Sequence, residues 1–457
     1  MKLAGVIAIT AALAAWPKPA VARTWHATPG GVRAVLEEVT AGDTVLLARG
    51  TYTGPLVVAR TITLAGEAGA VIDGRGSGTA LTVQADSSRV EGLTIRGSGK
   101  NAMTVDAGVH VQLARGVALS RLTLLDVMYG IYGERADGMA IEGCKLTGRV
   151  TPGDESGQGN GIHLWYTKSV TARRDTVTRF LDGIYLSFAD GTHIEATDVE
   201  HCGRYGLHTM YCPGGRLAGC RMSDNVAGCA IMFSNHLTLE GNDFSHNRGP
   251  RTYGVLLRDC SDGELTGNRL VDNTIAVFMD NSNRNRIASN LFQDDGWGVL
   301  LFSSCAGNQF TDNSFINDDY PVALDMRYSD NHFDDGRRGN YWSDGEAYDL
   351  NGDGVGDAAY SPVSAFAFLS KQYPDLAILA KSPAVAALGV SERVLPVLRP
   401  SEIVDRFPLV RPTGAAAATG SPVAEARSKP SWQAAAAFGL VALGAAGVLV
   451  GAGRAWS

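Results

Sequence analysis

A short apolar segment that opens on glycine recurs through the middle of the chain: GIHLW at 161–165, GIYLS at 183–187, GLHTM at 206–210, GCAIM at 228–232 and GVLLR at 254–258. Ala276 and Gly298 continue the series, so the segments begin 22, 23, 22, 26, 22 and 22 residues apart. A fixed period of this size is typical of a solenoid. One coil of a parallel β-helix uses about this many residues, and equivalent residues of successive coils stack about 4.8 Å apart. The repeat therefore predicts columns of neighbouring side chains.

Within each segment apolar residues alternate with other residues, which predicts a short strand with one buried face. Asn, Asp or Cys recurs at two turn positions of the repeat: Asp175, Asp198, Cys220, Asn242, Asn268, Asn290 and Asn313 at one, and Cys202, Asn225, Asn247, Asn273, Asp295 and Asp318 at the other. Stacked amides can hydrogen-bond along the coil axis. We predict an all-β protein, a right-handed parallel β-helix of about 22-residue coils, with weaker coils from about Thr61 to Gln158. A leucine-rich repeat is disfavoured because its L-x-x-L-x-L-x-x-N pattern is missing.

The two ends of the chain differ in composition from the repeats. An apolar run at 3–15 followed by Ala20-Val21-Ala22 predicts a cleavable signal peptide. Near the other end, residues 433–453 carry no formal charge and are long enough to span a bilayer as a helix. The alternative is a packed helix, since the run is rich in Gly and Ala. The predicted organisation is a signal peptide at 1–22, a β-helix at 23–345, a Ca-loop-like turn with a helical segment at 346–412, a linker at 413–431 and a transmembrane helix at 432–453.

Composition narrows the range of partners. A net charge of −7 gives no basic surface for nucleic acid, so we expect no nucleic-acid partner. A short amphipathic helix at Val32–Val39 is expected to cap the open end of the solenoid, because an uncovered strand edge invites pairing with other chains. Seven cysteines cannot all form pairs. Cys229 shares its register with Ile162 and Ile184 and should point inward, and the disulfide pairing stays open.

The outward columns carry the functional signal. Inward positions hold small or aliphatic residues, so the alternate positions should face outward. One outward column reads Tyr132, His163, Tyr185, His208, Ala230, Leu256, Phe278 and Leu300, and its neighbour reads Trp165, Ser187, Met210, Met232, Arg258, Asp280 and Phe302. A solvated sheet face would hold Lys, Glu and Thr instead. We therefore predict a contact surface that includes His163, Trp165, Tyr185, Phe278 and Phe302.

His208, Met210 and Met232 form a candidate metal site on this face. His208 and Met210 lie two residues apart on one strand, and Met232 follows Met210 by one coil. An imidazole with two thioethers suits Cu(I), whereas zinc would recruit more thiolate, His or carboxylate. The alternative is that both methionines pack beneath an insert loop. His201, Asp224 and His246, stacked on another corner, are a weaker candidate.

A second candidate metal site follows the repeats. Asp349, Asn351, Asp353 and Asp357 occupy oxygen-ligand positions of a calcium loop, and Val355 supplies the carbonyl position. Tyr360 stands where a bidentate Glu belongs, so this calcium site should be weak or completed from elsewhere. The alternative is a polar turn.

These features together resemble the NosD family, periplasmic maturation proteins of nitrous oxide reductase. The segments that carry the resemblance are RYGLHTMY at 204–211, NYWSD at 340–344, DLNGDGVGD at 349–357 and SPAV…PVLRP…VDRFPL within 382–409. It extends from about Arg23 to Pro412. The family's HxMY-like strand falls on His208, Met210 and Tyr211.

The resemblance implies a function and a set of partners. The chain would be a periplasmic copper-handling accessory protein rather than an enzyme, and the predicted helix at 432–453 would anchor it in the inner membrane. It would work with an ABC transporter, whose ATPase and membrane subunits are separate chains, and with nitrous oxide reductase. A copper-donor lipoprotein is a further candidate partner, and the cargo is open between Cu(I), a sulfur species or both.

Two other function classes remain at this point. Secreted polysaccharide lyases, hydrolases and epimerases often use this fold, and the outward aromatic residues could stack on sugars. Such enzymes need clustered carboxylates, but the outward columns offer mainly Asp280, with Arg258 beside it. The third class is a purely structural surface solenoid. The His–Met pair argues mildly against it.

Overall fold

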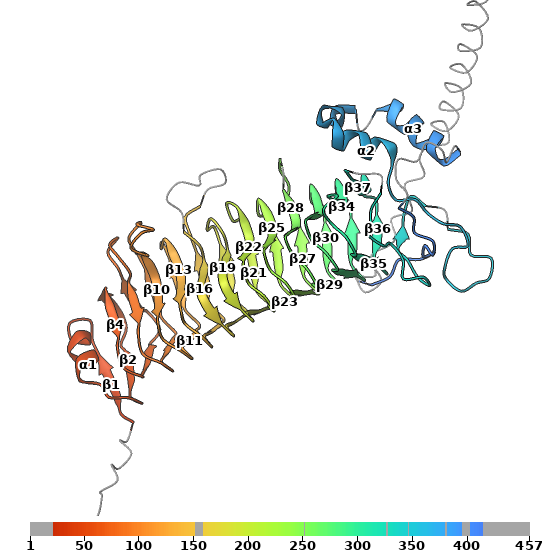
Figure 1. The fold of residues 1–457 in the computed structure, drawn as a ribbon. Helices are drawn as coiled ribbons and strands as arrows, with labels where there is room; N and C mark the ends of the chain where they lie inside the picture. Colours follow the sequence, from red (N-terminus) through yellow and green to blue (C-terminus); the bar gives the residue numbers. More distant parts are fainter. Residues whose placement is uncertain are drawn as a thin grey trace, which may run out of the picture.

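A computed structural model describes residues 22–150, 159–250, 252–325, 328–345, 347–379, 382–394 and 403–414. The chain forms a right-handed parallel β-solenoid of about 13 turns, with coils of about 23 residues (Figure 1). The predicted β-helix is thus confirmed. Coils already begin at Thr24, well before the expected start near Thr61, because the early strands are short and poor in the glycine motif.

Three parallel sheets run the length of the solenoid. Sheet A contains β1 (Thr24–Ala27), β2 (Thr44–Leu47), β5 (Thr63–Gly66), β8 (Arg89–Glu91), β11 (Ala118–Ser120), β14 (Ala140–Glu142), β17 (Thr171–Arg173), β20 (His193–Glu195), β23 (Arg216–Ala218), β26 (Thr238–Glu240), β29 (Glu264–Thr266), β32 (Arg286–Ala288) and β35 (Gln309–Thr311). Sheet B contains β3 (Gly50–Thr53), β6 (Ala70–Asp73), β9 (Thr94–Arg96), β12 (Thr123–Leu125), β15 (Lys145–Thr147), β18 (Thr176–Thr178), β21 (Asp198–Glu200), β24 (Arg221–Ser223), β27 (Asp243–Ser245), β30 (Arg269–Val271), β33 (Leu291–Gln293), β36 (Ser314–Ile316) and β38 (Tyr341–Trp342).

Sheet C carries the glycine-led segments of the repeat. Its strands are β4 (Leu56–Val58), β7 (Leu81–Val83), β10 (Ala107–Gln112), β13 (Tyr129–Glu134), β16 (Ile162–Lys168), β19 (Ile184–Asp190), β22 (Tyr205–Met210), β25 (Ala227–Met232), β28 (Tyr253–Arg258), β31 (Ile275–Asp280), β34 (Trp297–Leu301) and β37 (Tyr320–Leu324). Neighbouring strands pair residue for residue from coil to coil. Ile162, for example, lies beside Ile184, which lies beside Leu207.

The glycine that opens most of the repeats fits the short distance between coils, and Ala276 takes this position in one coil. A β-carbon added at Gly161, Gly183 or Gly206 would lie 2.5, 2.8 or 2.6 Å from the carbonyl oxygen of the corresponding glycine in the next coil. Contacts this short between a β-carbon and a backbone oxygen are sterically forbidden, so a side chain here would push adjacent coils apart. In these three coils, the glycine that reveals the fold in the sequence is therefore needed for steric reasons.

Asparagine ladders bond the coils together inside the turns, as predicted. Asn242 donates from its side-chain amide to Asn268 Oδ1 at 2.9 Å, Asn268 donates likewise to Asn290 at 2.9 Å, and Asn290 to Asn313 at 3.0 Å. A second ladder joins Asn247, Asn273 and Asp295, and a third, which the sequence analysis missed, joins Asn285, Asn308 and Asn331.

One predicted member of the first ladder is wrong. Asp198 is exposed and pairs with Thr176 and Arg221, one position beyond the ladder. Thr197 takes the ladder position instead, and its hydroxyl accepts the Asp175 main-chain N–H at 3.4 Å. The prediction placed the extra residue of the 23-residue step before this turn, whereas it lies after Thr197.

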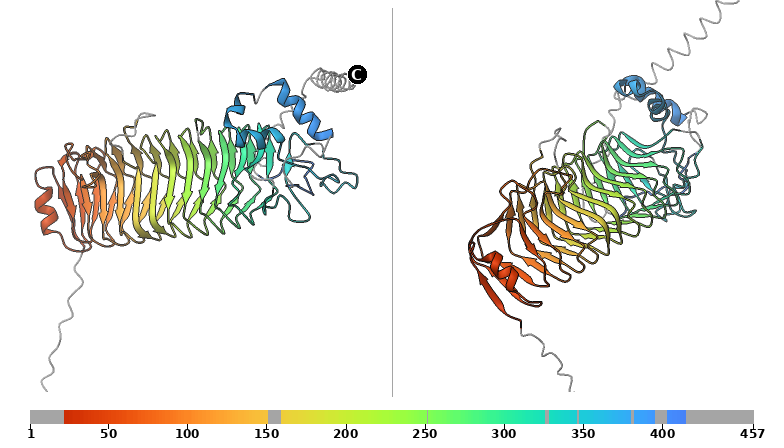
Figure 2. Two further views of the ribbon diagram at one scale, coloured as in Figure 1. Left: turned by 45° about the horizontal axis from the view of Figure 1, so that its top comes forward. Right: turned by 60° about the vertical axis from the view of Figure 1, so that its left-hand side comes forward.

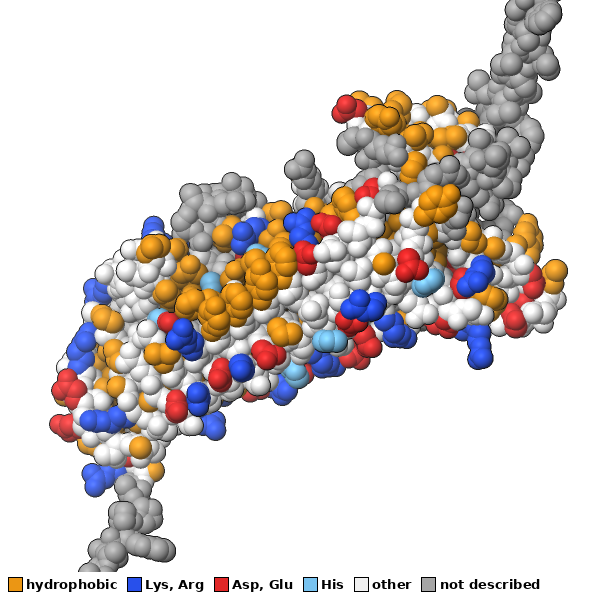
Figure 3. Space-filling view, in the orientation of Figure 1, with side chains coloured by type: hydrophobic (Ala, Val, Ile, Leu, Met, Phe, Trp, Pro, Cys, Tyr) orange, Lys and Arg blue, Asp and Glu red, His pale blue; other side chains and the backbone are white. Residues whose placement is uncertain are grey.

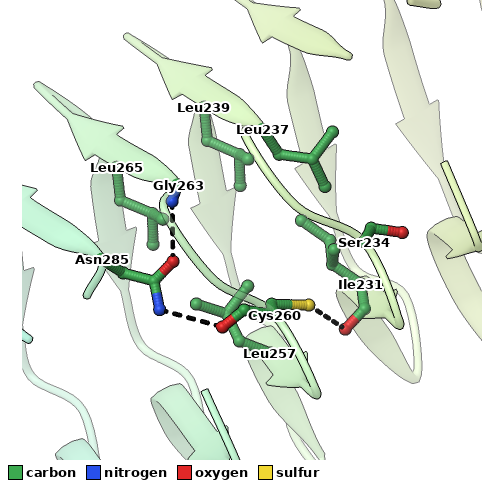
Figure 4. A pocket seen from close by; sticks show the side chains of 9 residues that line it. All are labelled: Ile231, Ser234, Leu237, Leu239, Leu257, Cys260, Gly263, Leu265 and Asn285. Atoms are coloured by element: carbon green, nitrogen blue, oxygen red, sulfur yellow. Dashed lines mark hydrogen bonds between the residues drawn. The ribbon is translucent and has the colours of Figure 1, made fainter. Parts of the chain in front are cut away.

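The seven cysteines, all of which lie in described segments, are buried and unpaired. Burial raises the pKa of the Cys202 thiol to about 12 and that of Cys260 to about 11, so both stay protonated near neutral pH. Figure 4 shows Cys260 in the packed interior, where its thiol donates to the Ile231 carbonyl at 3.3 Å. The space enclosed there is about 10 Å³, room for about one water molecule. At this point the solenoid interior holds no ligand-sized cavity.

Both ends of the solenoid are covered. Helix α1 (Val32–Glu38) lies across the N-terminal end and confirms the predicted cap (Figure 1). At the other end, Asp405 accepts hydrogen bonds from the Asn340 main-chain N–H at 2.7 Å and from the Trp342 indole at 2.8 Å. Leu409 bridges to Tyr341 of the last strand. The VDRFPL segment therefore closes the last coil.

Three short helices lie beside the C-terminal end of sheet C (Figure 2). They are α2 (Ala365–Gln372), the 3-10 helix η1 (Pro374–Leu379) and α3 (Pro383–Val394). Phe366 of α2 packs on Tyr320 of β37 with ring centroids 5.7 Å apart. This confirms the predicted C-terminal helical segment. Among the described residues, no helix has the length and apolar character needed to cross a membrane. Apart from Ala22, Thr413 and Gly414, the predicted signal peptide, linker and transmembrane helix lie outside those residues.

Replacing Asp175 with Asn should stabilise the solenoid at alkaline pH. Asp175 Oδ1 accepts the Cys144 main-chain N–H at 2.7 Å, but Oδ2 is buried without a hydrogen bond, and burial raises the carboxyl pKa to about 7. The carboxyl pKa is near 3.9 in the unfolded chain, so the neutral acid's contribution to stability is complete below about pH 4. It is lost as pH rises through about 7. Asp175→Asn should raise the unfolding free energy at pH 8 by about 1–3 kcal/mol.

Denaturant unfolding at pH 5 and pH 8 measures this effect. Asp198→Asn, at an exposed site one coil away, is the matched control and should change the unfolding free energy little at either pH. Equal effects of the two substitutions at pH 8 would contradict the assignment of Asp175 as a buried, raised-pKa carboxyl.

Candidate metal site

The outer face of sheet C carries an unbroken column of aromatic and imidazole rings. Strand pairing places His110, Tyr132, His163, Tyr185 and His208 side by side on five successive coils. Ring centroids are 4.4 Å apart for Tyr132 and His163, 4.7 Å for His163 and Tyr185, and 4.9 Å for Tyr185 and His208. The predicted column is confirmed, and His110 extends it by one coil.

This ring column differs from the outer face of sheet A. There, Arg216 pairs with Glu195 at 3.3 Å and with Glu240 at 2.7 Å, which is the charge ladder expected of a solvated surface. Figure 3 shows charged side chains gathered along one flank and an apolar band crossing the coils beside them. The outer face of sheet C is therefore the face whose composition calls for a functional explanation.

The structure brings His208, Met210 and Met232 together on this face. Met210 and Met232 are direct neighbours on β22 and β25, and each is partly exposed. His208 lies two residues before Met210 on the same side of β22, with 7% of its surface exposed. The two methionines thus lie on the outer wall, on adjacent coils, and their metal binding stays a prediction.

A buried carboxylate holds the His208 ring in one orientation. Asp182, which is fully buried just before β19, lies with Oδ2 3.2 Å from His208 Nδ1. Arg204 binds both oxygens of Asp182, at 2.8 and 2.5 Å. Burial alone would raise the pKa of Asp182, but the hydrogen bonds from Arg204 and His208 outweigh it and hold the pKa below its ordinary value. Asp182 is therefore a carboxylate and accepts the proton carried by Nδ1.

This arrangement leaves the other nitrogen of His208 free to bind. With the proton on Nδ1, neutral His208 carries a lone pair on Nε2. Nε2 is buried and has no hydrogen-bond partner within the described part of the chain. A buried polar atom without a partner needs an explanation. A carboxylate behind a histidine is also the common arrangement that orients metal-binding imidazoles.

Sequence analysis missed Asp182 and Arg204. Asp182 stands directly before a repeat glycine, Gly183. The spacing was the available signal. Asp182 and Arg204 are 22 residues apart, which is the length of one coil. Periodicity placed them near each other, but it could not show that the Asp182 side chain contacts both Arg204 and His208.

His163 has the opposite proton arrangement. The Asn160 amide accepts the Asp182 main-chain N–H through Oδ1 at 3.3 Å, so its Nδ2 faces His163 Nδ1, 3.0 Å away, and donates to it. Burial lowers the pKa of His163 to about 4, so the ring stays neutral with its proton on Nε2. His110, in turn, has Nε2 3.2 Å from Glu134 Oε2. Of these three rings, His208 is the one with a buried nitrogen that has no hydrogen-bond partner among the described residues.

Tyr185 connects His208 to Met210. Its ring lies edge-on to His208, and its hydroxyl lies 3.6 Å from Met210 Sδ, within the range of an O–H···S hydrogen bond. One sulfur lone pair of Met210 is thus engaged by a donor while the other stays available. Tyr185, predicted as part of a contact surface, lies inside the candidate metal site.

The other predicted surface residues lie beside this site, since Met232 itself packs against the apolar cluster that contains Phe278. Trp165 is partly exposed and contacts Tyr166 with ring centroids 5.0 Å apart. Phe278, 7% exposed, packs with Phe302 in an apolar cluster on the C-terminal half of sheet C that reaches Ala367 of α2. The contact role of His163, Trp165, Phe278 and Phe302 stays a prediction.

The calcium loop is exposed, and its carboxylates bind its own backbone. Asp349 accepts main-chain N–H groups of Gly352, Asp353 and Gly354, and Asp357 accepts that of Leu350. Across the described segments, no three His, Cys, Asp or Glu side chains are grouped to hold a metal ion. That includes His201, Asp224 and His246. The calcium ligands Asp349, Asn351, Asp353, Val355 and Asp357 stay a prediction.

Known proteins identify the family. A family model described as periplasmic copper-binding protein (NosD) matches residues 147–347. A relative from Pseudomonas aeruginosa, named probable ABC transporter binding protein NosD, is 33% identical over 384 residues, which cover 80% of this chain and 87% of the relative. The chain belongs to the NosD family.

A second NosD relative agrees with this assignment. The protein of the same name from Stutzerimonas stutzeri is 28% identical over 381 residues, covering 80% of this chain and 86% of its own. Among solved structures, the Dettilon tailspike protein matches with a TM-score of 0.50 and 14% identity over 69% of this chain and 66% of its own. At that identity the likeness shows the fold alone. The resemblance to the NosD family seen in the sequence is confirmed.

The two proton arrangements can be measured directly. In histidine-selective ¹⁵N NMR spectra at pH 8, His208 should show an unprotonated Nε2 and a protonated Nδ1, because Asp182 accepts from Nδ1. His163 should show the reverse, because Asn160 donates to its Nδ1. His208→Gln and His163→Gln spectra assign the two signals. A proton on Nε2 of His208 would remove the candidate metal ligand.

Proposed function

We propose that this chain is a non-enzymatic accessory protein of the periplasm that holds Cu(I) transiently at His208, Met210 and Met232. It passes the ion on during assembly of the copper centres of nitrous oxide reductase. The observation that carries the proposal is the buried, unpartnered Nε2 of His208, fixed by Asp182, on the strand that also carries Met210. Membership in a family described as copper-binding and periplasmic supports it.

The ligand set favours Cu(I) over other metals. Imidazole nitrogen and thioether sulfur are neutral, soft ligands, which suit Cu(I). Zinc sites need thiolate, histidine or carboxylate in larger number. The thiols nearest in register, Cys212 and Cys229, are buried, and burial raises the pKa of each, so neither supplies a thiolate. Because the three ligands are neutral and lie at a partly open surface, they bind Cu(I) reversibly.

The surrounding groups position the ligands. Asp182 holds the His208 ring through Nδ1, and Arg204 compensates the buried charge of Asp182. Unlike a ligand on a mobile loop, each candidate ligand extends from a strand whose backbone is fixed on both sides by neighbouring coils. Transfer then needs little rearrangement of this chain.

The proposal includes the partners expected from the sequence. The relatives are named as ABC transporter binding proteins, which supports association with a transporter made of ATPase and membrane subunits. A helix at 432–453 would keep the solenoid at the membrane surface. A copper-donor lipoprotein would load the site, and nitrous oxide reductase would receive the ion. A sulfur species as cargo is the alternative within the same role.

One observation favours the polysaccharide alternative. An open groove of about 680 Å³ lies on the N-terminal part of sheet C, lined by polar side chains that include Gln84, Asp106, His110 and Gln112. Hydroxyl and amide groups of this kind could bind a polar polymer. The acids nearby have other partners, however, since Glu134 binds His110 and Asp106 accepts from Thr104 at 2.8 Å. The groove supports binding better than hydrolysis, which needs a free pair of carboxylates.

Anaerobic Cu(I) titration against a competing chelator tests the copper site. The full chain should bind one Cu(I), and the double variant His208→Ala/Met210→Ala should weaken binding about 100-fold or more, which corresponds to about 2.7 kcal/mol. Met232→Leu, which keeps the volume but loses the sulfur, should weaken it about tenfold. His193→Ala, an exposed histidine of sheet A, is the control and should bind like wild type.

Two results would overturn the copper site. Unchanged affinity and stoichiometry in the His208→Ala/Met210→Ala variant would exclude these ligands. Turnover of uronate polymers by the same wild-type preparation would favour the polysaccharide alternative instead.

Tyr185→Phe should bind Cu(I) more tightly. The variant keeps the ring contact with His208 but loses the hydroxyl that engages Met210 Sδ at 3.6 Å. A hydrogen bond of about 0.5–1.5 kcal/mol no longer withdraws electron density from the sulfur, so the dissociation constant should fall about two- to tenfold. The same chelator competition measures it, with Tyr205→Phe, whose ring also touches His208, as the control. Weaker binding by Tyr185→Phe would mean that the hydroxyl assists the ion rather than competing with it.

A further inference from the structure

Four exposed aromatic side chains form a continuous stack along one corner of the solenoid. Tyr166, Phe188, Tyr211 and Phe233 occupy this corner on successive coils, and we call them the aromatic ridge. Their ring centroids are 4.6, 5.0 and 4.9 Å apart, with planes within 13° of parallel. Each is 39–45% exposed, and Figure 3 shows an apolar band across the middle coils of this face.

The backbone of the aromatic ridge is unusual for such residues. All four have positive φ, between 50° and 57°, a conformation that costs bulky L-residues about 1–2 kcal/mol each and is better suited to Gly, Asn or Asp. The same corner position holds Leu113 and Arg135 on the two preceding coils and Asp259 and Asn281 on the two following coils, also at positive φ. Aromatic residues thus occupy four coils at a position better suited to residues such as Asp259 and Asn281, and the backbone preference of the turn does not explain them.

Those four coils are the ones that carry the candidate copper ligands and their neighbours. Tyr211 follows Met210 directly, and Phe233 follows Met232. On the strand side the ridge is bordered by uncharged residues, whereas charges begin one coil beyond at each end, with Arg135 and with the Arg258–Asp280 pair at 3.2 Å. An apolar aromatic centre with a charged rim is the composition of a protein–protein interface.

We propose that the aromatic ridge is the docking surface for the protein that accepts Cu(I) from His208, Met210 and Met232. The inference rests on the proposed function. Direct ligand exchange requires the acceptor's ligands to come within about 3–3.5 Å of the ion, so the acceptor must lie over the two methionines. A specific interface covers about 800 Å² on each partner, and the ridge begins one residue away. The ridge therefore lies inside the acceptor's footprint.

The stacking geometry selects a protein over a sugar. A sugar packs against the face of an aromatic ring, but in the ridge the rings cover each other's faces and present their edges to solvent. At one end of the stack, the Arg135 guanidinium lies 6.0 Å from the Tyr166 ring centroid. A row of ring edges fits an apolar protein surface. The expected partner is a folded protein whose copper site opens on an uncharged, apolar face.

The test separates docking from copper binding. In Phe188→Asn/Phe233→Asn, two of the four rings are replaced by a residue suited to positive φ, so the fold should be retained. Apo-nitrous oxide reductase serves as the acceptor. Cu(I) transfer from the loaded chain should slow at least tenfold, and the dissociation constant of the two proteins should rise at least tenfold. Cu(I) affinity against a chelator should stay within twofold of wild type. Leu113→Asn, at the same corner and 61% exposed, should behave like wild type in all three measurements.

Each outcome decides one of the two proposals. Wild-type transfer and wild-type binding by the ridge variant would overturn the docking surface and leave the copper site standing. If wild type binds no Cu(I), the proposed function fails. In that case the dissociation constant of the copper-free proteins still tests the ridge, which is overturned if the variant binds the reductase as wild type does. Loss of Cu(I) affinity in the ridge variant would also overturn it, because the residues would then belong to the metal site.

Discussion

The coil-to-coil contact is the constraint on which the rest of this structure depends. Adjacent coils approach so closely that the opening residue of most repeats has no room for a β-carbon, as at Gly161 and Gly206. The asparagine ladders bond the same coils edge to edge, with Asn268 both accepting from Asn242 and donating to Asn290. Together they fix the register, so a residue in one coil has a defined neighbour in the next.

That register makes a surface site possible without a pocket. A globular enzyme gathers its ligands around a cavity, whereas here the candidate ligands lie on the outer face of a sheet, one coil or two residues apart. Met210 and Met232 are neighbours because their strands pair. The chemistry of the site is then set by a few buried groups behind the wall. Asp182, which Arg204 binds, fixes the proton of His208 on Nδ1. Asn160 makes the opposite choice for His163, so similar rings in one column have different capacities.

The outer face of sheet C is divided into zones along the axis. A polar groove lies beside His110, the candidate copper ligands lie in the middle coils with the aromatic ridge beside them, and an apolar cluster continues towards α2. Because a solenoid is nearly one-dimensional, such zones can differ in function without sharing residues. A partner docked on the middle coils would leave helix α2 available for other contacts.

The sequence by itself determined the fold, the outward column and the pairing of Met210 with Met232. The reason is that the repeat length directly sets which residues of neighbouring coils lie side by side. It failed where coils have unequal arms, as at Asp198, whose place in the ladder Thr197 takes. Only the tertiary structure decided the proton arrangement of His208 and the stacking of Tyr166, Phe188, Tyr211 and Phe233. Both depend on side-chain directions at turns, where backbone conformation rather than spacing sets what a residue meets. A period counts residues between coils, but it carries no information on which way a buried carboxylate or an exposed ring points.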